Sequence, residues 1–203
     1  MSSPEQRING RPAPRWAWWV ATGFGSGRLR PAPGTWGSLA GLLAWLLLTL
    51  PLAVPLNTWA IRNGGDRLFW TVRAGIELYF LALPIAMAWL AIRAADRVVA
   101  ETGEKDPGYI VADEWAGMFV ALWPLRMLMT DNLHRIALPG GWRFLALLAI
   151  PFFAFRLFDI LKPWPCRQIQ DLPGGQGVVA DDVVAGLYAI PLTLALIPFL
   201  MAR

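Results

Sequence analysis

Long apolar stretches alternate with shorter polar stretches along most of this chain. Five stretches are long and apolar, and in chain order they are residues 36–53, 74–92, 115–129, 143–161 and 183–201. A helix of about 20 apolar residues crosses the hydrocarbon core of a bilayer, which is about 30 Å thick. The pattern therefore predicts an all-α, multi-spanning membrane protein with about five apolar helical segments.

Each of these segments contains a proline, and two of these prolines bear on the prediction. Membrane helices accommodate a residue such as Pro84, in segment 74–92, because neighbouring groups satisfy the carbonyl that it frees. Segment 115–129 is the shortest of the five and contains Pro124. Both a complete crossing and a re-entrant path stay open for it.

The polar stretches are predicted to form loops and turns. Residues 23–38 are rich in glycine and proline, and residues 57–73 contain the turn sequence NGGD. Residues 93–114 begin with helical spacing, and this helix is predicted to end at Thr102-Gly103. Residues 131–142 are predicted to form a short polar link.

The distribution of charge predicts an orientation if all five segments cross the membrane. One face then holds residues 1–35, 93–114 and 161–182, and the other face holds residues 54–73 and 130–142. With Arg156 included, the first face has eleven of the eighteen Lys and Arg residues. Because positively charged loops favour the cytoplasm, we expect this face, with its polar loops, to be cytoplasmic.

Composition supports a single membrane domain. Hydrophobic residues make up 56% of the 203 positions and there are 12 Trp, whereas soluble proteins average roughly 45–50% apolar residues. We expect residues 1–20 to form a polar N-terminal tail and interfacial anchor, and residues 21–203 to form one membrane-embedded domain. The net charge is +4, and the basic residues are spread along the chain without forming a run. This distribution favours anionic lipid over nucleic acid as a partner. No oligomeric state follows from the sequence.

Cys166 and His134 are the only residues of their types. One cysteine excludes an intrachain disulfide and a cysteine-based zinc site, and one histidine excludes lipid phosphatases that need two. Leu172 stands six residues after Cys166, where a cysteine-phosphatase loop has arginine. We therefore expect Cys166 to fill space beside the membrane.

Charged residues are concentrated between the last two apolar segments and at the start of the third. The carboxylates are Asp113, Glu114, Asp159, Asp171, Asp181 and Asp182, and the nearby cations are Arg156, Lys162 and Arg167. Acids beside a membrane are costly unless they face water, a metal ion or a cation. Oxygen donors without soft ligands favour Mg²⁺ or Mn²⁺. Two such ions polarise a phosphoryl oxygen and activate a water molecule.

Several of these residues also have purely structural interpretations. Asp113 and Glu114 open a predicted helix, where acids stabilise the N-terminus without any further function. Asp159 and Lys162 are three residues apart and could form a salt bridge on one helix face. Residues 23–38 match neither a dinucleotide-binding pattern nor a P-loop, so they form either a flexible lead-in to a helix or a phosphate-binding loop.

The doublet Asp181-Asp182 is more specific, because it follows GGQG at a predicted helix start. An acidic doublet beside a glycine loop is more typical of a metal site than of a solvated surface. The predicted topology also brings residues 113–114 and 23–38 to the same membrane face. Residues 156–186 are therefore predicted to form half of a site that these upstream segments complete.

Three blocks of sequence, in this order, resemble the phosphatidylglycerophosphatase A family. They are GFGSGRLRPAPGTWGSL at 23–39, YIVADEWAGM at 109–118 and FRLFDILKPWPCRQIQDLPGGQGVVADDVVAG at 155–186. The resemblance implies Mg²⁺-dependent removal of the terminal phosphate from phosphatidylglycerophosphate at the cytoplasmic face of a bacterial inner membrane. Family members usually have His-Gly where this chain has Pro107-Gly108, and an aliphatic residue in place of Cys166.

The resemblance also implies roles for individual residues. The implied Mg²⁺ ligands are Asp113, Glu114, Asp159, Asp181 and Asp182, and the implied catalytic residues are Asp113, Glu114, Asp159, Lys162 and Asp182. The implied phosphate-binding residues are Ser26, Arg28, Thr35, Lys162, Arg167 and Asp171. One carboxylate would orient the attacking water, and a covalent aspartyl-phosphate stays open as an alternative.

The residues also bear on two other functions. A phosphotransferase that makes the same lipids has the pattern D-x2-D-G-x2-A-R, which is missing from this sequence. A small transporter or channel with an acidic cation site at one membrane face is the alternative function. Its acids should recur at mid-membrane positions of several helices, whereas here they collect at the ends of segments.

Overall fold

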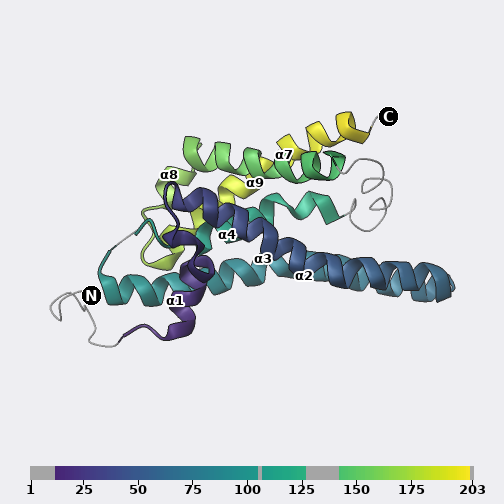
Figure 1. Ribbon diagram of the computed structural model, residues 1–203, viewed down its shortest axis with the longest axis horizontal. Coiled ribbons are helices and arrows are strands. Elements are labelled where there is room, and N and C mark those ends of the chain that lie inside the picture. Colours follow the sequence, from purple (N-terminus) through teal and green to yellow (C-terminus); the bar gives the residue numbers. More distant parts are fainter. Residues whose placement is uncertain (1–11, 105–106, 127–141, 202–203) are drawn as a thin grey trace.

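The computed structural model describes residues 12–104, 107–126 and 142–201, and this part of the chain is built of helices without a β-strand (Figure 1). Four of its helices are long and apolar enough to cross a membrane. They are α2 (Pro33–Asn63), α3 (Asp66–Thr102), α7 (Trp142–Leu161) and α9 (Gly175–Met201). The predicted all-α membrane fold is confirmed.

Five short elements connect or fill the spaces between the long helices. They are α1 (Arg15–Ala21), η2 (Gly23–Arg28), α4 (Ala112–Ala121), η3 (Trp123–Leu125) and α8 (Cys166–Ile169). α1 buries Ala17 and Ala21 in a cluster with Ala94 and Val98 of α3. Its Trp19 side chain stays exposed.

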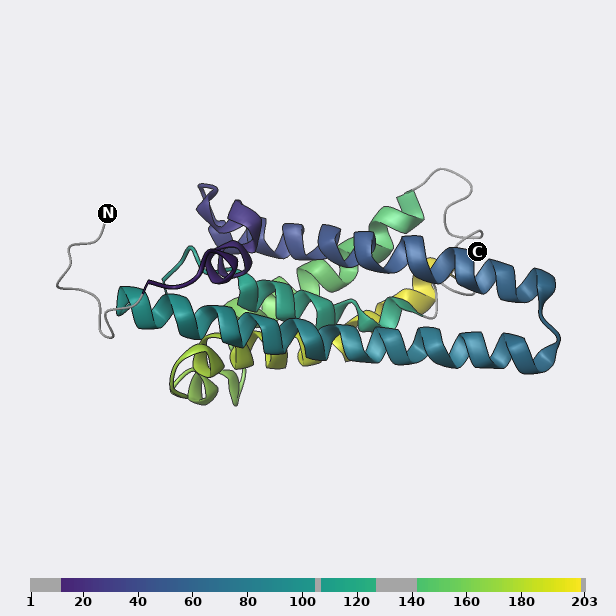
Figure 2. The same ribbon diagram turned by 90° about the horizontal axis from the view of Figure 1, so that it is seen from below.

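α2 and α3 form a long antiparallel hairpin, and Figure 2 shows the two helices running side by side. The prediction of a polar loop at residues 57–73 is wrong. α2 continues to Asn63 and α3 begins at Asp66, so only Gly64 and Gly65 separate the helices. Polar side chains end an apolar run, but they do not by themselves end a helix. The turn signal in NGGD is confirmed.

α2 and α9 also begin earlier than predicted. α2 starts at Pro33, inside the predicted loop 23–38, because proline suits the first helical position. α9 starts at Gly175, eight residues before the predicted segment 183–201. The backbone N–H of Gly175 donates to Asp96 Oδ1 on α3 at 2.6 Å. This tertiary cap satisfies one of the free N–H groups of a helix N-terminus.

The predicted end of the charged helix at Thr102-Gly103 is confirmed. α3 ends at Thr102, and Gly103 has a φ of 73° in the left-handed region, where glycine is favoured. Segments 74–92 and 93–102 are parts of this one helix.

α4 lies in the middle of the bundle and packs against α2, α3, α7 and α9 (Figure 1). It has ten residues and is followed by η3, so this part is too short for a crossing of about 20 residues. Of the predicted segment 115–129, residues 127–129 lie outside the described part. The predicted link 131–142, with His134, also lies outside it except for Trp142, which begins α7. The five predicted segments thus correspond to four candidate spans and a short central helix.

Glycines allow α4 to approach its neighbours closely. A β-carbon on Gly117 of α4 would lie 2.6 Å from the carbonyl oxygen of Asp182 on α9, and one on Gly186 would collide with the carbonyl oxygen of Gly117. A β-carbon on Gly41 of α2 would lie 3.1 Å from the Cα of Trp115. Membrane helices commonly pack through small residues in this way.

The variant Gly117→Ala should therefore push α4 and α9 apart. We expect it to lower the free energy of unfolding by about 1–3 kcal/mol, the usual cost of overpacking, as measured by thermal unfolding in detergent. Gly75→Ala is the matched control, because a β-carbon there meets nothing within 4 Å. The control should be unchanged or about 1 kcal/mol more stable. A Gly117→Ala variant as stable as the parent would contradict the packing described here.

Candidate active site

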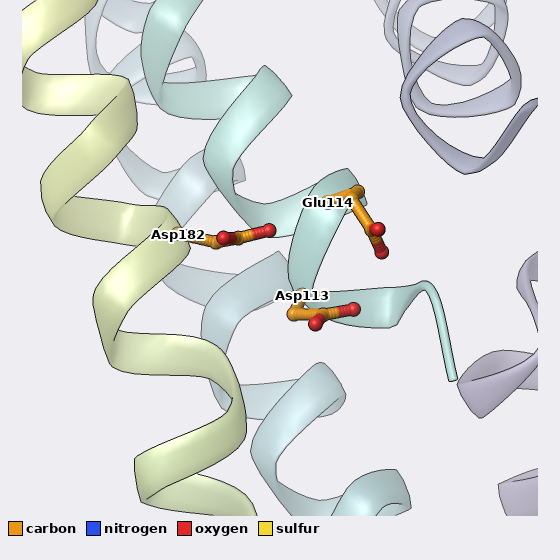
Figure 3. Close-up of side chains that lie close together, drawn as sticks. All are labelled: Asp113, Glu114 and Asp182. Atoms are coloured by element: carbon orange, nitrogen blue, oxygen red, sulfur yellow. The ribbon is translucent and has the colours of Figure 1, made fainter. Parts of the chain in front are cut away.

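Three carboxylates converge at one end of the bundle. Asp113 and Glu114 lie in the first turn of α4, and Asp182 lies in the early part of α9. One oxygen from each residue falls within 4.8 Å of the other two. Figure 3 shows Asp182 reaching from α9 toward the turn of α4 that bears the other two acids. This spacing allows one cation to contact all three side chains.

The contact between α4 and α9 explains this convergence. Asp113 stands four residues before Gly117, and Asp182 stands four residues before Gly186. Because the two glycines meet, the acids one helical turn earlier also lie near each other. The prediction placed Asp182 at the start of a helix, but it lies in the second turn of α9. The shared spacing of ADEWAG and ADDVVAG is a sequence signal for this pairing.

Arg156 of α7 connects three helices at the site. Its guanidinium forms an ion pair with Asp159 and lies 3.9 Å from Glu114 Oε1. Its Nη1 also donates to Ser38 Oγ on α2 at 3.3 Å. Sequence reasoning gave no role to Arg156 or Ser38, although Arg156 lies three residues before Asp159, the spacing of a same-face ion pair.

Lys162 does not form a salt bridge with Asp159, which was the purely structural interpretation of this pair. α7 ends at Leu161 and Lys162 has a φ of 45°, so its side chain leaves the helix face. It donates instead to Asp181 Oδ2 at 2.8 Å, and Gln170 Nε2 donates to the same oxygen at 2.8 Å. Sequence reasoning also missed Gln170.

The electrostatics of the site reflect its crowded acids. Burial raises the pKa of Glu114 to about 8, and the charges of Asp182 and Asp159 also raise it. A hydrogen bond with Asp113 and the charge of Arg156 lower this pKa. Burial lowers the pKa of Lys162, but its hydrogen bond with Asp181 and the neighbouring acidic charges raise it overall.

The donor set fits a hard divalent cation. Glu114 Oε2 and Asp181 Oδ1 are buried carboxylate oxygens without a hydrogen-bond partner, and buried polar atoms are costly when unsatisfied. Carboxylates are the ligands that Mg²⁺ prefers. Among the described residues, the group with metal-ligand spacing is Asp113, Glu114 and Asp182. Asp159 and Asp181, the other two predicted ligands, are engaged by Arg156 and Lys162.

The predicted phosphate-binding residues are only partly brought to the carboxylates. Lys162 contacts Asp181, and Ser26 Oγ is a buried atom without a hydrogen-bond partner. The remaining four, Arg28, Thr35, Arg167 and Asp171, have exposed side chains. Arg28 lines a polar cleft of about 720 Å³ together with Trp18 and Tyr109.

These features define a helical membrane protein with an oxygen-donor site at one end of its bundle. The family model of phosphatidylglycerophosphatase A matches residues 19–197. The chain therefore belongs to the phosphatidylglycerophosphatase A family, as the three sequence blocks predict, and is an enzyme of the phosphatase class.

Three relatives cover most of the chain. A Haemophilus influenzae protein named phosphatidylglycerophosphatase A is 34% identical, over 87% of this chain and 86% of its own length. An Escherichia coli protein of the same name is 31% identical, over 83% of this chain and 76% of its own. A Bacteroides thetaiotaomicron protein with the provisional name phosphatidylinositol-3-phosphatase is 33% identical, over 84% of this chain and 86% of its own length. No solved structure gives a significant match.

The contact between Lys162 and Asp181 can be tested by a double-mutant cycle. Lys162→Met leaves a buried carboxylate with one partner fewer, and we expect it to destabilise the protein by about 1–3 kcal/mol. The loss in the double variant with Asp181→Asn should be smaller than the sum of the single losses. Unfolding in detergent measures each value, and Arg167→Met, which removes an exposed cation nearby, is the control. Strictly additive losses would mean that the two side chains do not interact.

Proposed function

We propose that this protein hydrolyses the terminal phosphate of phosphatidylglycerophosphate to give phosphatidylglycerol, in a Mg²⁺-dependent reaction at the cytoplasmic face of a bacterial inner membrane. The observation that carries the proposal is the convergence of three carboxylates from α4 and α9. The names of the three relatives support it, because each name describes the removal of a phosphate monoester from a lipid headgroup.

The depth of the site suits a lipid headgroup. Exposed aromatic side chains surround this end of the bundle, and they are Trp16, Trp19, Phe24, Trp36 and Trp164. Such side chains collect at the boundary between hydrocarbon and water. A phosphate at headgroup depth would therefore lie level with the ends of α2, α4 and α7.

We assign Asp113, Glu114 and Asp182 to the metal, because one carboxylate oxygen of each residue lies within 4.8 Å of those of the other two. A divalent cation held there would polarise a phosphoryl oxygen and lower the pKa of a bound water. Arg156 holds Glu114 and Asp159 in position through its contacts with both. Lys162 stays protonated, because its pKa is raised, and it offers a positive charge to the phosphate.

Asp159 is the acid that we assign to the attacking water, because it lies outside the metal group and is oriented by Arg156. The oxygen of the water forms a bond to phosphorus as the bond from phosphorus to the glycerol oxygen breaks. Asp159 accepts the proton of the water, and the leaving glycerol oxygen takes up a proton. The products are inorganic phosphate and a lipid alcohol.

The transporter or channel has less support. Its cation site should involve acids at mid-membrane positions of several helices, whereas the described cluster lies in the first turn of α4 and the second turn of α9, at one end of the bundle. Glu77, an acid of α3, is engaged by Arg126 at 2.8 Å and by Arg73 at 3.3 Å. Membership of a phosphatase family also favours the enzyme.

Asp182→Asn removes one of the three grouped carboxylates with almost no change of shape. Loss of even an outer partner of a metal site costs roughly 10–100-fold in activity, so we expect Mg²⁺-dependent phosphate release to fall by more than this. Asp66→Asn, an exposed acid at the opposite end of α3, is the control and should retain full activity. Full activity of Asp182→Asn at normal protein level would remove the basis of the site assignment.

The substrate class can be tested with three phosphomonoesters and the purified protein. Phosphate release should be fastest from phosphatidylglycerophosphate, slower from phosphatidic acid and slowest from a soluble phosphomonoester, and it should require Mg²⁺. We expect this order of rates because anchoring of the substrate in the bilayer and contacts with its glycerol headgroup both contribute to recognition. Equal rates on all three substrates would contradict the specificity proposed here.

A further inference from the structure

An apolar groove of about 560 Å³ lies between α3 and α9, and no carboxylate among the described residues lines it. Its walls include Leu81, Ile85 and Trp89 of α3 and Leu187 and Ile190 of α9, and Trp123 of η3 also contributes. Figure 2 shows α9 beside the middle of α3, and the two helices are in contact. The groove opens on the surface of two candidate spans, so it faces lipid.

The length of the groove along α3 matches the thickness of the hydrocarbon region of one bilayer leaflet. Its lining on α3 extends from Leu81 to Ile92, which corresponds to roughly 16 Å at 1.5 Å per residue. This is about half of a hydrocarbon core of about 30 Å. An acyl chain of a lipid in the same leaflet would therefore fill it lengthwise.

Arg93 lies one turn beyond the groove on α3, and Arg97 lies one turn further. Leu81, Ile85, Trp89, Arg93 and Arg97 are spaced by four residues and form a row that turns by about 40° at each step, so that Arg93 borders the groove and Arg97 lies beside Arg93 on the exposed side. The guanidinium carbon of Arg93 is 5.3 Å from the ring centre of Trp89, which places its charge at the mouth of the groove. The row thus changes from apolar to basic where the groove ends.

Arg93 and Arg97 are available to bind an anion. Both side chains are exposed, and neither has an acidic partner among the residues that the structure describes. The nearby carboxylate of Asp96 accepts a hydrogen bond from the backbone of Gly175. Two unpaired guanidinium groups at headgroup depth are complementary to a phosphodiester, and basic pockets between membrane helices bind anionic lipid headgroups.

We propose that this groove binds an anionic glycerophospholipid, with one acyl chain between α3 and α9 and the phosphodiester on Arg93 and Arg97. This lipid is distinct from the substrate. α3 and α9 are in close contact above the groove, where a β-carbon on Gly175 would lie 2.9 Å from the backbone nitrogen of Asp96. The bound lipid stabilises α9, the helix that carries Asp182.

The test measures thermal unfolding of the whole protein in nonionic detergent with added phosphatidylserine or phosphatidylcholine. Phosphatidylserine is anionic but is neither the proposed substrate nor the proposed product, so its effect does not depend on the proposed reaction. We expect phosphatidylserine to raise the midpoint of unfolding by several degrees and phosphatidylcholine to raise it much less. Equal shifts with the two lipids would overturn the proposal.

Two variants locate the effect. The double variant Arg93→Gln with Arg97→Gln should lose the shift caused by phosphatidylserine. The matched control, Arg62→Gln with Arg67→Gln, removes the same charge from exposed positions at the other end of the hairpin and should keep it. Ile85→Trp narrows the groove at an exposed position and should also reduce the shift. A full shift in the Arg93 and Arg97 variant would overturn the assignment of the phosphate.

Discussion

The backbone contact between Gly117 and Gly186 is the constraint on which the site depends. Neither residue has a side chain to hold α4 and α9 apart, and a β-carbon on Gly186 would strike the carbonyl oxygen of Gly117. Asp113 and Asp182 lie one helical turn before these glycines, so the close contact of the helices fixes the spacing of the acids. The position of a short, ten-residue helix thus decides whether the carboxylates can share a cation.

Two cations, Arg156 and Lys162, lie at the edges of this acidic group. Arg156 engages Asp159, and Lys162 engages Asp181 with help from Gln170. The centre keeps an excess of negative charge. Burial of Glu114 and the negative charges of Asp182 and Asp159 together raise the pKa of Glu114. Such an arrangement is costly near a bilayer unless a cation joins it, and this cost is the physical reason for assigning a divalent ion to the centre.

Hydrophobic pattern predicted five apolar segments, four of which are long helices, and with the charges it predicted the gathering of the acids at one end, but it missed the starts of α2, α3 and α9 and the end of α2. α9 begins at Gly175 because Asp96, distant in sequence, caps it. The helices of the α2–α3 hairpin continue through polar residues, because polarity alone does not end a helix. The topology assumed that segment 115–129 crosses the membrane. The described part of this segment is too short for that, and the acids meet because α4 packs closely against α9.

Side-chain partners were harder to predict than positions. Asp159 has a cation three residues away on each side, Arg156 and Lys162, and both spacings allow a same-face ion pair. The choice depends on where α7 ends, because the positive φ of Lys162 turns its side chain toward Asp181 instead. Residue spacing alone could not decide between the two cations, since the end of the helix is set by the Pro-rich turn that follows.

α9 joins the proposed catalytic and lipid-binding features in one helix. Asp182 and Gly186 face α4, Asp181 faces Lys162, and Leu187 and Ile190 face the groove beside α3. A change in the packing of α9 against α3 would therefore move Asp182 relative to Asp113, because a helix shifts as a rigid unit. Lipid on one face of α9 and metal ligands on another are coupled through this helix.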